Sequence, residues 1–184
     1  MTLLLTMTSP APSSRVAEFH EVYLAEIPFV CRMLVRLGVE KRHVHDLAHD
    51  VFLAAFQGFD SYDRARPVRP WLLGICFHRA QAFGARAQQQ REHQVDYPEV
   101  VDERPDAAEE IEARQGRELV LKGLSALDLE KRAVFAMHDI EGCAMPEVAE
   151  ALSIPLNTAY SRLRRARELF KAEVQRLRVG GGSS

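Results

Sequence analysis

Apolar residues recur along this chain at steps of three and four, which is the spacing of one face of an α-helix. The clearest case is residues 44–56, where one apolar stripe predicts a helix of about twelve residues. A helix is also expected from Val16 to Leu37, with a kink at Pro28 and a stop at Gly38. No stretch alternates as a half-buried strand does. The pattern therefore predicts an all-α fold.

Two further groups of helices follow. An apolar stripe opens at Trp71 and continues through Leu72, Ile75, Cys76, Ala80 and Phe83. The helical pattern returns at about Ala107, with stripes formed by Leu119, Val120, Leu124 and Leu127 and then by Val134, Phe135, Met137 and Ile140. Between these groups lies a segment with two prolines, many acidic residues and no helical period, which predicts a flexible linker.

Charge divides the chain in the same way. Residues 1–91 hold 11 Lys/Arg against 8 Asp/Glu, residues 92–113 hold 1 against 9, and residues 114–184 hold 12 against 9. Two mildly basic blocks thus flank an acidic bridge, although the whole chain carries a net charge of −2. We expect two small helical domains, at 15–91 and 114–178, joined by an acidic linker at 92–113. A disordered leader is expected at 1–14 and a flexible tail at 179–184.

Residues 145–167 fit a helix, a tight turn and a second helix. Val148, Ala149 and Leu152 would form the inner face of the first helix, and small Ala149 would allow a close crossing. The second helix has its own inner stripe of Ala159, Leu163, Ala166 and Phe170. This geometry is that of a helix-turn-helix, whose second helix enters the DNA major groove. Asn157 or Thr158 would suit the N-terminal cap of that helix.

Four arginines lie on this second helix, namely Arg162, Arg164, Arg165 and Arg167. A planar guanidinium pairs with guanine edges or with phosphate, so the cluster favours DNA binding. A basic run can also be a simple solvated face. Periodicity and charge alone leave these two interpretations evenly balanced, and the preceding helix and turn favour DNA.

Other chemistry is poorly supported. No apolar run approaches the roughly 20 residues of a membrane span. The three cysteines, Cys31, Cys76 and Cys143, are far apart, as in a reduced cytoplasmic protein. His45 and His49 have a spacing that could bind a metal, and His43 lies nearby, but no further ligands complete a site. No phosphate loop, nucleophile motif or pair of catalytic carboxylates is present, so we expect neither an enzyme nor a cofactor.

Two segments together resemble a known family. Residues 124–167, "LSALDLEKRAVFAMHDIEGCAMPEVAEALSIPLNTAYSRLRRAR", resemble region 4 of bacterial extracytoplasmic-function (ECF) sigma factors of the sigma-70 family. Residues 45–80, "HDLAHDVFLAAFQGFDSYDRARPVRPWLLGICFHRA", resemble region 2 of the same family. The two lie in the family's order, and the resemblance covers roughly residues 15–177.

For region 2, the resemblance implies two surfaces. The first would dock on the β′ coiled coil of core RNA polymerase, through Asp46, His49, Asp50 and Leu53; without the family, a solvated acidic face would be the simpler interpretation. The second would open the −10 promoter element, with cations for the backbone and aromatic side chains for an unstacked base. Its candidates are Asp60, Tyr62, Asp63, Arg64, Arg66, Arg69, Trp71, His78, Arg79 and Arg86. Trp71 could equally be a core residue.

For region 4, the resemblance implies contact with the −35 element as duplex and with the polymerase β flap. The candidates are Asn157, Thr158, Tyr160, Ser161, Arg162, Arg164, Arg165 and Arg167. Three departures stand out: Ser153 replaces the usual turn glycine, His78 the usual asparagine, and Asp128 the usual proline after Leu127. The basic end of region 2 is also thin, with only Arg86 and Arg91.

The sequence thus predicts an alternative sigma factor that directs promoter-specific initiation. The resemblance implies a cytoplasmic bacterial protein regulated by an anti-sigma partner, which can hold it at the membrane. Two competing hypotheses are a stand-alone helix-turn-helix regulator and a sigma-like decoy that binds polymerase or an anti-sigma factor without initiating transcription.

Overall fold

The computed structural model describes residues 12–91 and 108–180, and these ranges contain helices and turns with no strand. The N-terminal unit comprises α1 (Pro12–Arg36), α2 (Lys41–Gly58) and α3 (Val68–Arg91). The C-terminal unit comprises α4 (Ala108–Ser125), α5 (Leu129–Phe135), the π-helical turn η1 (Ala136–Ile140), α6 (Met145–Ala151) and α7 (Leu156–Gly180). The predicted all-α fold is confirmed.

Three predicted boundaries need correction where helices extend further than expected. Helix α1 begins at Pro12, inside the predicted leader 1–14. Helix α4 begins at Ala108, so the predicted linker 92–113 is too long at its C-terminal end. Helix α7 continues to Gly180, past the start of the predicted tail at residue 179. The other parts of the predicted leader, linker and tail fall at residues 1–11, 92–107 and 181–184, which lie outside the described residues.

The core of the N-terminal unit follows the predicted stripe of α2. Val44, Leu47, Ala48, Val51, Phe52 and Ala55 are all buried, and Phe56 is half-buried. These residues pack against α1 and α3, which also contact each other. Pro28 lies inside α1, which continues through it as one helix to Arg36. These three helices thus enclose one apolar core.

The predicted helix-turn-helix is present as α6, a short turn and α7. Its turn contains Ser153, the position where the family usually has glycine, and this residue has φ of 54°. A positive φ is uncommon for a residue with a Cβ, so the turn keeps the geometry that glycine normally supplies. Val148, Ala149 and Leu152 are buried as predicted, as are Ala159, Leu163 and Ala166 on α7.

The pattern did not anticipate the π-helical turn. The apolar stripe through residue 140 predicted regular helix, but η1 follows α5 over Ala136–Ile140, and Glu141 N–H donates to the Ala136 carbonyl at 3.0 Å. A five-residue hydrogen-bonded turn widens the helix and changes where the following side chains point. Asp139 and Glu141 come directly from this widened turn, and both form ion pairs with arginines elsewhere in the chain.

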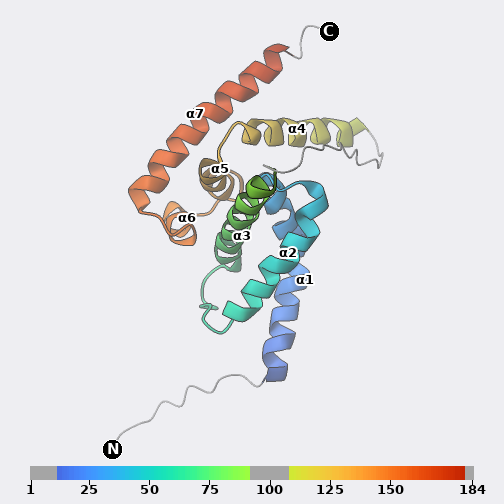
Figure 1. Cartoon of the computed structure of the whole chain (residues 1–184), viewed down its shortest axis with the longest axis vertical. Coiled ribbons are helices and arrows are strands. Elements are labelled where there is room, and N and C mark those ends of the chain that lie inside the picture. Colours follow the sequence, from blue (N-terminus) through green and yellow to red (C-terminus); the bar gives the residue numbers. More distant parts are fainter. Residues whose placement is uncertain (1–11, 92–107, 181–184) are drawn as a thin grey trace, which may run out of the picture.

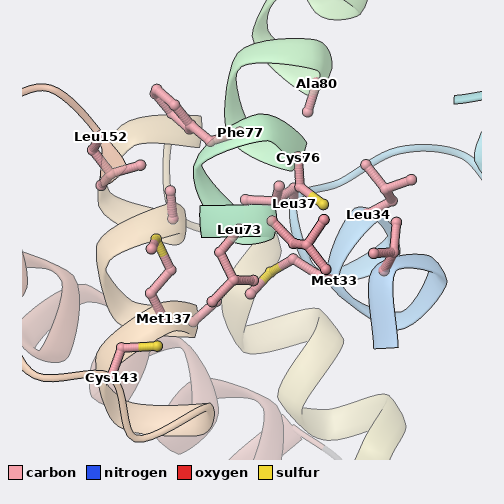
Figure 2. Close-up of a cluster of buried hydrophobic side chains, with 14 of the residues drawn as sticks. Met33, Leu34, Leu37, Leu73, Cys76, Phe77, Ala80, Met137, Cys143 and Leu152 are labelled. Carbon is pink, nitrogen blue, oxygen red and sulfur yellow. The ribbon is translucent and has the colours of Figure 1, made fainter. Parts of the chain in front are cut away.

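The two units pack against each other through α3 and α6. Figure 1 shows α3 in the middle of the molecule, with α1 and α2 on one side and α5 and α6 on the other. Figure 2 shows the apolar side chains at this junction, where Leu73 and Phe77 of α3 meet Met137 and Leu152 of the C-terminal unit. All four side chains are buried, so the apolar core is continuous between the two units.

Candidate nucleic-acid interface

The candidate polymerase-binding residues lie together on the solvent face of α2. Asp46, His49, Asp50 and Leu53 are all exposed, at spacings of three and four that place them on one side of the helix. Leu53 is 50% exposed, which is unusual for a leucine in a helix with a well-filled core. An exposed leucine beside carboxylates is a mixed apolar and acidic surface, suited to a partner that presents both aliphatic and basic side chains.

Three arginines of the candidate −10 surface, Arg64, Arg66 and Arg69, are exposed but already paired. Arg64 donates to Glu18 of α1 at 2.5 and 3.2 Å. Arg69 donates to Glu26 at 3.0 Å and lies over the ring of Phe29, with its Cζ 4.6 Å from the ring centroid. Hydrogen bonding to Glu18 raises the pKa of Arg64. These ion pairs hold the guanidinium groups at the surface, where water and salt screen them and a phosphate can compete for them.

Arg66 is paired across the junction between the two units. Its guanidinium donates to both carboxylate oxygens of Glu150, on α6, at 2.7 and 2.6 Å. This bidentate pairing raises the pKa of Arg66, and hydrogen bonding from Arg66 lowers the pKa of Glu150. Both side chains remain substantially exposed, at 48% and 62%. The pair therefore closes the edge of the junction without being buried in it.

Tyr62 and Trp71 form an aromatic surface next to these arginines. Their rings are stacked with centroids 4.6 Å apart, and Phe59 lies behind them as a fully buried ring. The Tyr62 hydroxyl donates to the carbonyl of Arg66, which fixes the loop between α2 and α3. Trp71 is half-buried, so it contributes both to the core and to the accessible surface.

A cavity of about 380 Å³ opens beside the aromatic pair. The loop and α3 supply one wall, including Tyr62, Arg66, Trp71 and His78. The opposite wall comes from α6, through Glu147, Glu150 and Ala151. The candidate −10 surface is therefore concave and aromatic, as an unstacked base requires, but one of its walls is acidic.

The remaining −10 candidates are spread more widely. Asp60 pairs with Arg15 at 3.1 Å, and Asp63 accepts the backbone N–H of Ala65 at 3.0 Å, so both carboxylates have structural partners. His78 lies beside the cavity, and Arg79 and Arg86 are exposed further along α3. The structure thus brings Tyr62, Arg66, Trp71 and His78 together around one cavity, while Arg86 lies outside it.

The arginines of α7 differ in how accessible they are. Arg162 is the least exposed, at 23%, because it pairs with Glu130 of α5 at 2.5 Å. Arg165 pairs with Glu168 one turn along α7, and Arg167 pairs bidentately with Asp139 of η1 at 2.8 and 2.7 Å. Arg164 is exposed and has no ion pair with any described residue. The accessible part of the predicted DNA-binding surface of α7 is thus centred on Arg164 and Arg165 rather than on Arg162.

The polar candidates at the start of α7 lie on the same accessible side. Asn157, Tyr160 and Ser161 are exposed, with Tyr160 at 52%, and Thr158 is half-buried. The predicted capping role of Asn157 or Thr158 is wrong, because α7 begins earlier, at Leu156. Both residues lie instead in the first turn of the helix, where their side chains project from its N-terminal end, the part of a recognition helix that contacts bases.

The acidic partners of these arginines were not anticipated from the sequence. Glu18, Glu26 and Glu150 read as ordinary solvated positions in a helical pattern. Only the packing of α1 and α6 beside the arginine loop turns them into partners. The one available sign was the abundance of acidic residues in an otherwise basic block.

The histidine cluster does not gain ligands from the fold. His45 and His49 are exposed on α2, and His43 packs against the ring of Phe83 with centroids 5.0 Å apart. Among the described residues, no group of three or more His, Cys, Asp or Glu side chains is arranged to hold a metal ion. Within the same residues, no helix is both long and apolar enough to cross a bilayer.

Comparisons with known proteins bear on both units. The family model "Sigma-70, region 4" matches residues 117–170, which span the end of α4 through most of α7. The curated relative "RNA polymerase sigma factor NccH" of Alcaligenes xylosoxydans xylosoxydans is 29% identical over 153 residues, covering 77% of this chain and 78% of the relative. The "ECF RNA polymerase sigma-E factor" of Escherichia coli K12 is 26% identical over 153 residues, covering 78% of this chain and 80% of the relative.

Solved structures share the fold. The structure of CnrH in complex with the cytosolic domain of CnrY matches with a TM-score of 0.61 and 22% identity, covering 94% of this chain and 93% of that one. The sigma factor RpoE in complex with the anti-sigma factor NepR, from Bartonella quintana, matches with a TM-score of 0.67 and 19% identity, covering 86% and 97%. The relatives, the region 4 match over the helix-turn-helix and the shared fold agree: the chain is similar over most of its length to ECF sigma factors of the sigma-70 family, and its residues 117–170 match region 4 of that family.

Proposed function

We propose that this chain is an alternative sigma factor, which binds core RNA polymerase and directs initiation at promoters with a defined −35 and −10 element. The observation that carries the proposal is the separation of three exposed surfaces on one helical frame. They are the acidic and leucine-bearing face of α2, the aromatic cavity beside α3 with Arg66 in its wall, and the arginine face of α7. A sigma factor needs one such surface for polymerase, one for single-stranded DNA and one for duplex DNA.

Each surface has a distinct physical task. On α2, Asp50 and its neighbours would pair with basic side chains of the β′ coiled coil, and Leu53 would pack against aliphatic ones. Beside α3, Tyr62 and Trp71 would receive an unstacked base, and arginines would neutralise the backbone phosphates. On α7, arginines would contact bases and phosphates of the −35 duplex, while the C-terminal unit meets the β flap. The chain itself makes and breaks no bond in this proposal, since the polymerase carries out the chemistry.

The proposal also assigns a compartment and a regulator. Its partners, polymerase and promoter DNA, place the chain in the bacterial cytoplasm. Two proteins with this fold have been solved with regulators: CnrH with the cytosolic domain of CnrY, and RpoE with the anti-sigma factor NepR. By analogy we propose an anti-sigma partner for this chain, and a membrane-linked partner would hold it at the membrane.

Transcription start mapping after overexpression, followed by run-off transcription on a mapped promoter with purified core polymerase, tests the proposal. A specific run-off product is expected. Binding to polymerase without product would support the decoy hypothesis instead. Binding to duplex DNA without binding to polymerase would support a stand-alone regulator. Each alternative result would refute the sigma proposal.

Matched variants test the individual surfaces. Asp50→Arg should abolish capture of core polymerase, whereas Glu118→Arg, an equal charge change at an exposed site of α4, should not. Arg165→Ala should weaken −35 binding, whereas Arg176→Ala should not, although both arginines form exposed ion pairs with a glutamate three residues away on α7. Equal effects of the two members of either pair would remove that surface from the proposal.

A further inference from the structure

Helix α1 carries a buried carboxylate to which none of the proposed surfaces gives a role. Glu26 is 9% exposed and is the one charged residue that is buried in the described part of the chain. A carboxylate removed from water destabilises the fold unless it is paired, so its position in the core needs a reason. We propose that Glu26 is a positioning residue for promoter opening: it holds Arg69 so that the terminal nitrogens of the guanidinium face a phosphate of the separated strand. The inference rests on the proposed function, which gives the surface around Arg69 its meaning.

The pairing of Arg69 with Glu26 uses one edge of the guanidinium group. Nε of Arg69 donates to Oε2 of Glu26 at 3.0 Å. Nε carries a single N–H, and the terminal nitrogens Nη1 and Nη2 carry the remaining donors. No described residue accepts a hydrogen bond from Nη1 or Nη2 of Arg69. The forked end, which is the end that binds phosphate, is therefore open while the other edge is anchored.

Phe29 holds the plane of the same guanidinium group. Its ring is 2% exposed, and Cζ of Arg69 lies 4.6 Å from the ring centroid. Glu26 and Phe29 are three residues apart on α1, so they share a face of the helix and reach Arg69 together. The electrons of an aromatic face attract a cation placed over it. The carboxylate thus fixes the direction of Nε, and the ring fixes the tilt of the group.

The two neighbouring arginines of the loop are held differently. Arg66 places both terminal nitrogens on Glu150, and Arg64 places Nε and Nη2 on a carboxylate of α1. The acidic partners in these two pairs are 62% and 39% exposed, whereas the carboxylate that holds Arg69 is 12% exposed. Water and salt screen an exposed carboxylate far more than a buried one. Of these three arginines, only Arg69 combines a buried anchor with a free fork.

The position of Arg69 suits a contact with the backbone of a strand. Arg69 lies in the first turn of α3, two residues before Trp71, and its side chain is 54% exposed. The N-terminal end of a helix carries partial positive charge, which favours a phosphate nearby. Trp71 lines the cavity beside α3, and Arg69 does not. Arg69 is therefore placed for a phosphate outside the cavity rather than for a base inside it.

Glu26 affects strand binding in two ways that have opposite signs. Its negative charge reduces the attraction between this surface and a phosphate. Its anchoring removes freedom that the long side chain of Arg69 would otherwise lose on binding. A substitution that removes only the charge should therefore keep or raise the affinity for a strand. A substitution that removes the hydrogen-bond acceptor as well should lower the affinity relative to the first.

Glu26→Gln and Glu26→Leu form the matched pair that tests this reasoning. Both remove one negative charge and have similar size, but only glutamine keeps an oxygen that accepts from Nε of Arg69. Binding of the full chain to a fluorescein-labelled oligo-dT strand is measured by fluorescence anisotropy at several salt concentrations. Glu26→Leu should bind about 2- to 10-fold more weakly than Glu26→Gln, the range expected for ordering one long side chain. Its plot of log affinity against log salt should also be flatter, by up to about 0.7, the contribution of one phosphate contact on a single strand.

Further variants separate positioning from charge and from stability. Glu18→Gln and Glu18→Leu make the same changes on the same helix at the exposed pair with Arg64, and should bind the strand within about 2-fold of each other. In an Arg69→Met background, the difference between the two Glu26 variants should disappear. Arg69→Lys leaves the buried site intact and keeps the charge, but lysine has no fork, so this variant should bind more weakly than wild type. Urea titrations define the conditions in which each variant is folded, and affinities are compared there.

The possible results distinguish the inference from the proposed function. Equal affinities and salt slopes for Glu26→Gln and Glu26→Leu would overturn the inference. So would an equally large difference in the Glu18 pair, wild-type affinity in Arg69→Lys, or no salt-dependent binding of the strand by wild type. The expected difference, with no run-off product from wild type and core polymerase, would support the anchoring of Arg69 and refute the proposed function. A run-off product without that difference would do the reverse.

Discussion

The C-terminal end of α1 offers a sharp test of how the two units are joined. Helix α1 ends at Arg36, and Gly38 adopts φ of 92° while its N–H donates to Val35 and that of Val39 donates to Leu34. These two bonds form a Schellman motif, for which glycine is preferred. They leave the Leu37 carbonyl without a helical partner, and Arg132 of α5 supplies one at 3.0 Å. A Cβ at Gly38 would lie 1.9 Å from Nη1 of Arg132.

Gly38→Ala should therefore cost stability in two separable ways. The positive φ costs an alanine about 1 kcal/mol. Displacing the Arg132 guanidinium costs a further ~2 kcal/mol, the usual range for a hydrogen bond to a charged group. Arg132 cannot easily move, since it also donates to Leu124 and Leu127 at 2.9 and 2.7 Å. Burial lowers the pKa of Arg132, consistent with a guanidinium held among carbonyls.

A double-mutant cycle separates the two costs. In an Arg132→Ala background the clash is gone, so Gly38→Ala should cost only about 1 kcal/mol, which gives a coupling of roughly 2 kcal/mol. Free energies of unfolding from urea titrations provide the measurement. Gly142→Ala is the control: Gly142 has φ of 73° but nothing within 4 Å of its added Cβ, so its cost should be unchanged by Arg132→Ala. A Gly38 coupling below about 0.5 kcal/mol would refute the reasoning.

Three further predictions concern the C-terminal unit. Gly123→Ala should destabilise the protein by about 1–2 kcal/mol, because the added Cβ would lie 2.5 Å from the Phe170 ring, which is stacked on Phe135. Gly116→Ala on the same helix should instead stabilise it by up to ~1 kcal/mol, because its Cβ would enter open space. Thermal melts that show the same sign for both variants would contradict this packing. Ser153→Gly should raise stability by up to ~1 kcal/mol by relieving the positive φ of the turn, and a lower melting temperature would mean that the Ser153 side chain has a stabilising role of its own. Asp128 caps α5 by accepting from the Lys131 N–H at 2.9 Å, so Asp128→Ala should cost about 1 kcal/mol. Burial alone would raise the pKa of Asp128, but the hydrogen bonds from Lys131 outweigh it and the pKa is lowered. The stability that wild type has over Asp128→Ala should therefore be complete above about pH 4 and should shrink as the pH falls through the lowered pKa. A difference in unfolding free energy that stays constant in urea titrations across this range would exclude the charged cap.

The sequence alone determined most of the residues that are buried in α2, α6 and α7. The stripe of α2 and the inner faces of α6 and α7 follow directly from a period of 3.6 residues, because a helix turns a fixed angle per residue whatever surrounds it. The same regularity placed Asp46, Asp50 and Leu53 together on one exposed face. The resemblance to the family also pointed to Ser153, which stands where the family usually has a turn glycine, and this residue has a positive φ.

Tertiary structure decided what the charged residues do. The sequence places Arg66 in a loop and Glu150 on a helix, but 84 residues separate them and only the packing of α6 on α3 makes them partners. The same holds for Arg162, whose accessibility is limited by Glu130 of a different helix, and for the π-helical turn that aims Glu141 at Arg36. The spacing of residues in the sequence sets the direction in which each side chain leaves its own helix. Which charged residues become partners depends on how different helices cross, and the shapes of the packed surfaces set those crossings.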